Sequence, residues 1–308
     1  MKTPYHEDKI ALFDLHCDTF LKLYYNNCSL YNSKTHISYD KLKCFSPYIQ
    51  VGAIWSDSKF SNDDSFANYL NTINHLKSIN IETALSVNKL NDLSFILAVE
   101  DARLLNGDIT RLDKLYKDGV RFLTLNWKGE SCIGGGWDTC SPLTSFGKEV
   151  VKKCADEKII IDLSHSSVNV QKEVIEMASI YSFSPVFSHS DSYSVCHHKR
   201  NIADGIFKEI VAHNGLVGIS LAPMHLENNG EASIYSLLTH IEKYLELGGE
   251  NSICLGCDFD GVDSLPKDIS SIADLSIVHS VFIKEFGKKI TDKIYFSNAY
   301  NYALKNLV

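Results

Sequence analysis

The stretch LFDLHCDTF, residues 12–20, places a histidine and two aspartates at the end of an apolar run. Such a run is typical of a buried strand, whose side chains alternate between its two faces. His16 and Asp18 therefore share one face with Asp14, and Cys17 points the other way. Buried imidazole and carboxylate groups persist mainly by pairing or by coordinating a cation. The stretch alone leaves two interpretations open: a metal site, or His16 capping the strand and Asp18 capping the turn after it.

Apolar runs of the same kind recur along the whole chain. Several are nearly continuous in Val, Ile and Leu, which is typical of parallel strands covered on both faces. Amphipathic helical patterns separate them, and the one at 233–249 ends in two glycines, an expected helix stop. The expected strands are residues 9–16, 49–55, 94–100, 119–126, 158–165, 185–189, 215–222 and 252–259. Eight β–α units in 308 residues predict an α/β fold, a (β/α)8 TIM barrel, with a doubly wound sheet as the alternative.

The chain carries no linker, repeat or low-complexity tract, so we expect residues 1–308 to form a single barrel domain. Residues 19–48 are rich in Tyr, Asn and Ser and are expected to be a loop insertion over one face of the barrel. The three glycines at 134–136, beside Trp137, fit either a flap over the site or a plain surface turn.

Composition excludes several classes of partner. The chain is 44% hydrophobic and 22% charged, with a net charge of -8 and no long basic run, which argues against nucleic acid or an acidic membrane. Because the N-terminus lacks an apolar signal region and no long apolar segment is present, we expect a cytoplasmic protein. The nine cysteines are scattered as reduced core thiols would be. The CLGC motif at 254–257 lies in an apolar strand without a second pair, so we expect core residues rather than zinc ligands.

Polar side chains gather where the expected strands end, and barrel enzymes assemble their sites at the carboxyl ends of the strands. These side chains are His16, Asp18, Glu100, Asn126, Trp127, Asp162, His165, His189, Asp258 and Asp260. A catalytic zinc takes three protein ligands and a water. The candidate ligands here exceed that number, which favours two metals that share a carboxylate. Glu100, from a middle strand, is the natural bridge. Mixed His and carboxylate ligands favour zinc, although manganese, iron or cobalt suits the same set.

A metal site of this kind acidifies a water molecule, which then needs a group to take its proton. Asp258, in GCDFDGVD, is the expected proton carrier, able to pass the proton to a leaving group. Asp260 is the competing candidate. The glycine that follows suggests a tight turn, so one of the two aspartates is expected only to hold that turn.

Seven stretches in order resemble the membrane (renal) dipeptidase family of zinc metallopeptidases, in its bacterial-type branch. They are DLHCDT, VEDARLL, GVRFLTLNW, LTSFGKEVV, IIIDLSHSS, PVFSHSDSYSVCHHKRNIAD and LGCDFDG, and they cover nearly the whole chain. The resemblance implies a (β/α)8 barrel with two Zn²⁺ per chain that hydrolyses dipeptides. By position, one metal's ligands would be His16, Asp18 and Glu100, and the other's Glu100, His165 and His189.

The same resemblance assigns two further residues. Asp258 matches the proton carrier, and Arg200 matches the arginine that holds the substrate carboxylate. A loop salt bridge from Arg200 to Asp204 is the alternative. One departure concerns Trp127, which stands where the animal enzymes carry a histidine thought to contact the substrate near the scissile bond. Trp127 is therefore expected to contact substrate, but the family's substrate preference does not transfer with it.

Together these observations predict a zinc-dependent dipeptidase that acts on small dipeptides with a free C-terminal carboxylate. The alternatives are another metal-dependent amidohydrolase, such as an N-acyl-amino-acid deacylase, and a catalytically silent metal-binding protein. Side-chain preference, tolerance of a D-residue, the metal used in the cell and the formation of a homodimer stay open at this stage.

Overall fold

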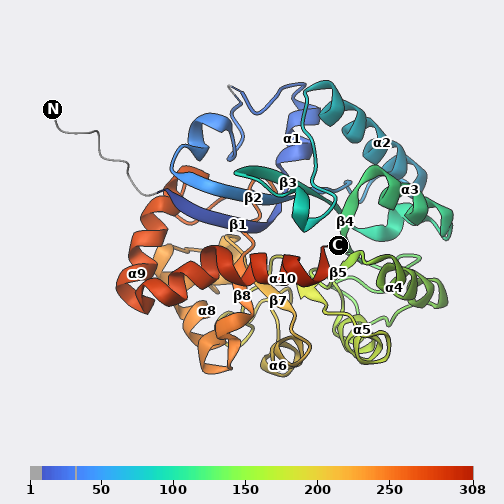
Figure 1. Ribbon diagram of the computed structural model, residues 1–308. Coiled ribbons are helices and arrows are strands. Elements are labelled where there is room, and N and C mark those ends of the chain that lie inside the picture. The colour runs from blue at the N-terminus through green and yellow to red at the C-terminus, as the bar shows by residue number, and fades with distance from the viewer. Residues whose placement is uncertain (1–8, 32, 308) are drawn as a thin grey trace.

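Eight parallel strands close into a barrel in chain order, as the computed structural model shows for residues 9–31 and 33–307 (Figure 1). The strands are β1 (Ile10–Cys17), β2 (Phe45–Ile54), β3 (Leu93–Glu100), β4 (Val120–Thr124), β5 (Ile160–Asp162), β6 (Val186–Phe187), β7 (Leu216–Ile219) and β8 (Ile253–Leu255). Asp14 pairs with Leu255, so the first and last strands form the seam that closes the barrel. The predicted (β/α)8 barrel is confirmed, and the doubly wound sheet is wrong.

Helices follow each strand and surround the barrel. They are α1 (Thr19–Tyr25), α2 (Asn62–Ser78), α3 (Thr110–Asp118), α4 (Ser145–Glu157), α5 (Val168–Tyr181), α6 (Asp204–Ala212), α7 (Pro223–Leu226), α8 (Ile234–Glu246), α9 (Leu275–Asp292) and α10 (Asn298–Asn306). Polar side chains begin several of them: Thr144 caps α4 and Ser167 caps α5 by accepting a backbone N–H. Within residues 9–31 and 33–307, no helix combines the length and apolarity needed to cross a membrane.

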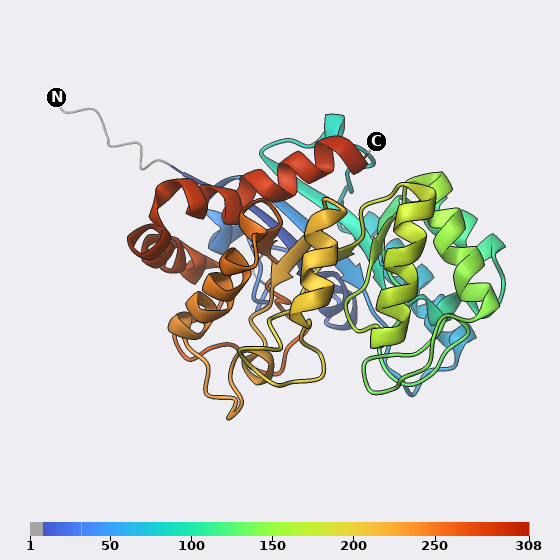
Figure 2. The same ribbon diagram turned by 90° about the horizontal axis from the view of Figure 1, so that it is seen from below.

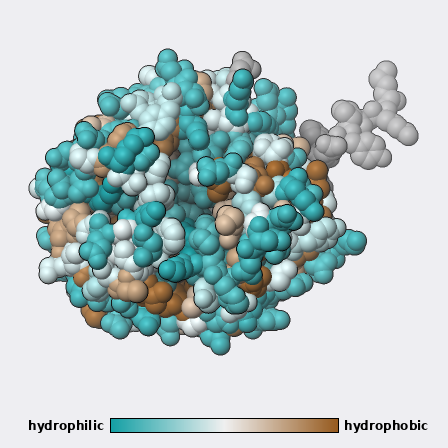
Figure 3. Space-filling view, turned by 180° about the vertical axis from the view of Figure 1, so that it is seen from behind, coloured by the Kyte–Doolittle hydropathy of each residue, from teal (hydrophilic) through white to brown (hydrophobic). Residues whose placement is uncertain are grey.

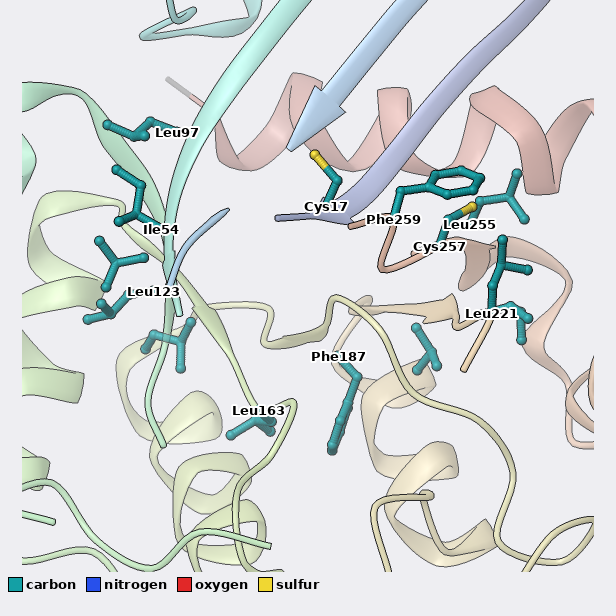
Figure 4. Packing of buried hydrophobic residues seen from close by; sticks show 14 of the residues in the cluster. Cys17, Ile54, Leu97, Leu123, Leu163, Phe187, Leu221, Leu255, Cys257 and Phe259 are labelled. Atoms are coloured by element: carbon teal, nitrogen blue, oxygen red, sulfur yellow. The ribbon is translucent and has the colours of Figure 1, made fainter. Parts of the chain in front are cut away.

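Buried apolar residues form two layers. One fills the barrel and is closed at one end by α10, whose Ala299, Tyr302 and Ala303 pack with strand residues such as Phe13 and Ile96. The other lies between the strands and the surrounding helices, and Figure 4 shows part of it. Figure 2 places α10 on one side of the barrel and the long loops that follow the strands on the other. The end opposite α10, where the strands have their carboxyl ends, is therefore the one left free for a site.

Several predicted boundaries differ from the structure. Residues 19–48 are not a plain loop, because Phe20, Leu21 and Leu23 are buried in the short helix α1 and β2 already begins at Phe45. Strands β5 to β8 are shorter than their apolar runs. Residues beyond their ends, such as Leu221, stay buried although they lie outside the strands, so apolarity alone overstates strand length.

Two glycines let the last three strands approach one another. A Cβ added at Gly218 or at Gly256 would overlap the carbonyl oxygen of Ser188. Because that oxygen belongs to backbone, the clash could be relieved only by moving the strands.

We therefore expect Gly256→Ala to destabilise the protein by about 1–3 kcal/mol, measured by urea unfolding. Gly205→Ala is the matched control, since Gly205 lies in α6 with open space around its added methyl group. A helical Gly→Ala change there should be neutral or stabilising by up to about 1 kcal/mol. Equal effects of the two changes would contradict the packing argument.

Candidate metal centre and active site

The end of the barrel opposite α10 opens into a cavity of about 630 Å³. Figure 3 views the molecule from this side and shows a hollow near its centre surrounded mainly by hydrophilic residues. Residues predicted for the site line the cavity together: Asp18, Glu100, Trp127, His165, Arg200 and Asp258. Its size is that of a pocket for a small molecule.

Glu100 lies at the centre of the site. Its Oε1 is 2.9 Å from His165 Nε2 and 3.7 Å from His189 Nε2, while its Oε2 is 3.4 Å from His16 Nε2. His165 and His189 face each other, with 2.8 Å between their Nε2 atoms. Glu100 thus presents one carboxylate oxygen to His16 and the other to His165 and His189.

Two aspartates extend the group on the side of His16. Its Nε2 is 3.6 Å from Asp18 Oδ2 and 3.8 Å from Asp258 Oδ1. His16, Asp18 and Asp258 could hold one metal ion by geometry, and so could His16, Glu100 and His189. We call the six side chains His16, Asp18, Glu100, His165, His189 and Asp258 the carboxylate–histidine cluster.

The cluster fits a divalent metal. His16 Nε2 and Asp18 Oδ1 are buried without a hydrogen-bond partner among the described residues. Buried polar atoms that lack a partner are rare in proteins, and imidazole with carboxylate is a common donor set for zinc and similar ions. Because two such atoms point into the same cluster, cation coordination explains them better than a structural role.

The electrostatics of the metal-free cluster point the same way. Burial, together with repulsion from Asp18, raises the pKa of Glu100, and burial with repulsion from Asp18 and Glu100 raises that of Asp258. Although burial opposes it, the neighbouring carboxylates raise the pKa of His16 well above its usual value. Burial and nearby positive groups lower the pKa values of His165 and His189. His165 and His189 are therefore neutral, and in the metal-free cluster a proton on His16 compensates part of the carboxylate charge, a role that a bound cation would take over.

A polar floor beneath the cluster orients two of its histidines. Asp162 accepts hydrogen bonds from Thr124 Oγ1 at 2.6 Å and from Ser188 Oγ at 2.6 Å. Since the Ser188 hydroxyl donates to Asp162, its oxygen is free to accept from the Nδ1 atoms of His189 and His16, at 2.8 and 3.3 Å. That arrangement places the proton on Nδ1 and leaves each Nε2 lone pair for the cluster. Asp162, singled out in the sequence, therefore supports the site from below.

The backbone is strained beside the cluster. His165, Asp258 and Asp260 have positive φ values of 64°, 60° and 68°, an uncommon conformation for residues other than glycine. Gly261 approaches so closely that an added Cβ would overlap the carboxylates of Asp18 and Asp258. The turn after β8 is thus shaped to bring Asp258 against the cluster.

The structure separates the two aspartates of this turn. Asp260 accepts a hydrogen bond from Thr19 Oγ1 at 2.6 Å and from the backbone N–H of His36 at 2.8 Å, and its own N–H donates to His36 Nδ1. It ties the turn to the segment after β1. Asp258 has no such tie and joins the cluster instead.

Simple alternation places Asp14 on the same face as His16 and Asp18, but its side chain does not join theirs in the cluster. The pairing of β1 with β2 shifts register between Asp14 and Cys17, so the two-residue period is interrupted there. The Asp14 carboxylate accepts a hydrogen bond from the Cys257 backbone at 2.8 Å, across the seam of the barrel. Burial raises its pKa to about 6.

The CLGC cysteines are buried in different core layers, as expected of core thiols.

Arg200 reaches the cavity from the loop after β6. Its side chain is buried, Nη1 donates to Ser190 Oγ at 2.9 Å and Nη2 to the His189 carbonyl at 3.0 Å. Its Nε has no partner among the described residues. The alternative salt bridge to Asp204 is wrong, because Asp204 pairs with Lys243 at 3.0 Å.

Aromatic side chains line the rest of the cavity. Trp127 lies where the sequence predicted it, with its ring centre 6.0 Å from that of His165 and 5.0 Å from that of Trp55. Trp55 and His225 also line the cavity, and sequence reasoning missed both. The position of Trp55 directly after β2 was an available signal.

Glycines 134–136 are buried, so the surface-turn interpretation of that stretch is wrong.

Comparison with known proteins identifies a family. Residues 6–298 match the model of the membrane dipeptidase family, peptidase family M19, which confirms the resemblance found in the sequence. Dipeptidase aclJ of Aspergillus oryzae is 30% identical over 196 residues, which are 59% of this chain and 45% of that protein. The match therefore spans less than half the length of that curated relative.

Solved structures share the fold over nearly the whole chain. A metallo peptidase from Rhodobacter sphaeroides, solved with a phosphinate mimic of the dipeptide L-Ala-D-Ala, has a TM-score of 0.89 at 21% identity and covers 97% of this chain and 100% of its own. The probable dipeptidase PvdM from Pseudomonas aeruginosa has a TM-score of 0.83 at 14% identity, covering 98% and 96%. At these identities the likeness establishes the barrel and its connections alone.

The different surroundings of Asp258 and Asp260 predict opposite effects on stability once metal is removed with a chelator. Because the folded-state pKa of Asp258 is raised, its ionisation costs stability as pH rises above the usual carboxyl range. Asp258→Asn should therefore raise the melting temperature near pH 8 by at least about 2 °C, and less near pH 5. Asp260→Asn should lower the melting temperature at both pH values, since an amide leaves one acceptor oxygen where Thr19 and His36 each use a separate one. Thermal unfolding followed by circular dichroism measures both, and equal shifts would contradict the assignment.

Proposed function

Because this chain belongs to the membrane dipeptidase family, peptidase family M19, we propose that it hydrolyses dipeptides with the help of two divalent metal ions, zinc being the expected metal. The position of Glu100 supports the proposal most. One of its carboxylate oxygens faces His16 and the other faces His165 and His189, as a carboxylate shared by two ions would require.

We assign the cluster to two ligand sets that share Glu100. His16 and Asp18 would hold one ion with it, and His165 and His189 the other. Bound divalent ions supply polarisation of the scissile carbonyl and a water of lowered pKa. The chain's part is to orient the histidines, which the Ser188 hydroxyl favours for His16 and His189, and burial keeps His165 and His189 neutral.

Asp258 is the proposed proton carrier. Its carboxylate borders the cavity beside His16, and its hydrogen bonding leaves it free of the tie that holds Asp260. A carboxyl whose pKa burial and neighbouring carboxylates raise is suited to accept a proton from water and return it to the departing amine.

Arg200 is the proposed anchor for the free C-terminal carboxylate. A guanidinium carries five N–H donors in a rigid fork, and the described residues use two of them. A buried cation with unused donors at the cavity wall favours an anionic ligand. Recognition of that carboxylate near the scissile bond distinguishes a dipeptide from a longer chain.

Substitutions in the cluster should separate metal binding from proton transfer. Asp258→Asn should keep about two ions per chain, like the wild type, yet lower kcat on dipeptides by roughly 100- to 10,000-fold, because an amide cannot carry the proton. Glu100→Gln should lower the metal content itself. Elemental analysis of zinc-loaded protein and a dipeptide hydrolysis assay measure the two effects.

A single ion that Glu100→Gln leaves in place would contradict the shared carboxylate. Cleavage of N-acyl amino acids without cleavage of dipeptides would favour the deacylase alternative. Two bound ions without turnover on either class would favour a metal-binding protein.

Arg200 predicts a dependence on the substrate carboxylate. Arg200→Ala should lower kcat/KM on free dipeptides by roughly 30- to 150-fold, the effect of one charged hydrogen-bonded pair, with metal content unchanged. Dipeptide amides should be poor substrates of the wild type and change little in the variant. Arg200→Lys is the matched control and should recover only part of the loss, since it keeps the charge without the fork. Equal losses on acids and amides would make Arg200 purely structural.

A further inference from the structure

The three tryptophans of the chain all line the cavity. None is fully buried, so each leaves part of its ring toward open space. Trp55 and Trp127 form one pair, with ring centres 5.0 Å apart and planes inclined by 59°. Trp137 lies apart from them, with its ring centre 5.8 Å from that of His198. Large aromatic surface in a ligand cavity is typical of a binding wall for an apolar group.

Trp55 lies on the side of the barrel opposite Arg200, and Trp127 lies between the two in the order of the strands. Trp55 follows β2 directly, and Trp127 follows β4, whereas Arg200 comes from the loop after β6. In the closed order of eight strands, β2 is opposite β6. Glu100 ends β3, between the two tryptophans, and its carboxylate reaches inward to the cluster. A molecule that spans the cavity from Arg200 across the cluster therefore ends against Trp55, with Trp127 beside it as the other member of the pair.

The side of the cavity near Arg200 is built differently. His198 Nδ1 accepts from the Arg200 backbone at 3.2 Å, and the rings of His198 and His225 are 4.6 Å apart. Burial and the nearby guanidinium lower the pKa of His225 to about 2, so this imidazole is neutral. Trp137 belongs to this side, which makes it a control for the other two tryptophans.

We propose that the Trp55–Trp127 pair binds the side chain of the substrate's N-terminal residue, and that the preferred substrates are dipeptides whose N-terminal residue is aromatic or otherwise large and apolar. This inference rests on the proposed function. If the C-terminal carboxylate lies on Arg200 and the scissile bond lies over Glu100, the N-terminal residue is the part that reaches the pair. The ring of Trp127, 6.0 Å from that of His165, would pack beside the reacting bond.

The test compares kcat/KM for Phe-Ala, Leu-Ala, Ala-Ala and the reversed Ala-Phe, using zinc-loaded enzyme. Phe-Ala and Leu-Ala should each exceed Ala-Ala by at least about tenfold, the usual discrimination of an apolar pocket. Trp55→Ala and Trp127→Ala should each reduce that ratio to less than about threefold, by loss of the aromatic contact. Trp137→Ala should keep the preference for Phe-Ala and Leu-Ala over Ala-Ala and change only kcat/KM for Ala-Phe. A wild-type ratio near one, or a ratio that both single variants retain, would overturn the proposal.

A binding measurement separates this inference from the proposed function. L-Phenylalaninamide and L-alaninamide mimic the N-terminal residue and lack the carboxylate that Arg200 would hold. Because all three tryptophans border the cavity, quenching of their fluorescence reports binding there. The phenylalanine amide should bind at least about tenfold more tightly, and Trp127→Ala should abolish the difference. Preferential binding without dipeptide cleavage would refute the proposed function alone, whereas cleavage without the preference would refute the subsite alone.

Discussion

The burial of Glu100 among three histidines is the constraint on which the rest of the site depends. A carboxylate at this depth, with Asp18 and Asp258 close by, is unfavourable unless positive charge compensates it. The neighbouring imidazoles meet that need only in part, because burial keeps His165 and His189 neutral. The arrangement is therefore balanced when cations join it, and folding stability and metal binding are coupled through the same few side chains.

The barrel supplies the rigidity that this balance requires. The residues of the cluster come from the ends of β1, β3, β5, β6 and β8, so no single loop could assemble them. Asp162 and Ser188 form a floor of hydrogen bonds that turns the histidines, and the positive φ values at His165 and Asp258 show backbone strain that the surrounding packing sustains. These strained residues lie at the carboxyl ends of the strands, and the opposite end of the barrel is filled by apolar packing against α10.

Much of the site could be predicted because the carboxyl ends of parallel strands meet at one end of a barrel. His16, Glu100 and His189 were placed together by that rule alone. Asp14 was misplaced because a register shift inside β1 cannot be read from alternation. The tie between Asp260 and His36 joins residues far apart in the chain, and Trp55 looked like an ordinary apolar strand residue. Such features depend on tertiary contacts, which no local pattern records.

The seam between β1 and β8 has a consequence for synthesis. Asp14 and Cys257 are 243 residues apart in the chain, and Thr19 and Asp260 are 241 apart, yet both pairs are hydrogen bonded. Contacts of such separation form late, because the intervening chain must first be ordered. On the ribosome, the nascent protein carries an incomplete, uncovered edge until residues near 260 emerge. Asp258, the proposed proton carrier, emerges with that closing step, and α10, which covers the other end of the barrel, emerges later still, so the site is complete only when most of the chain has been made.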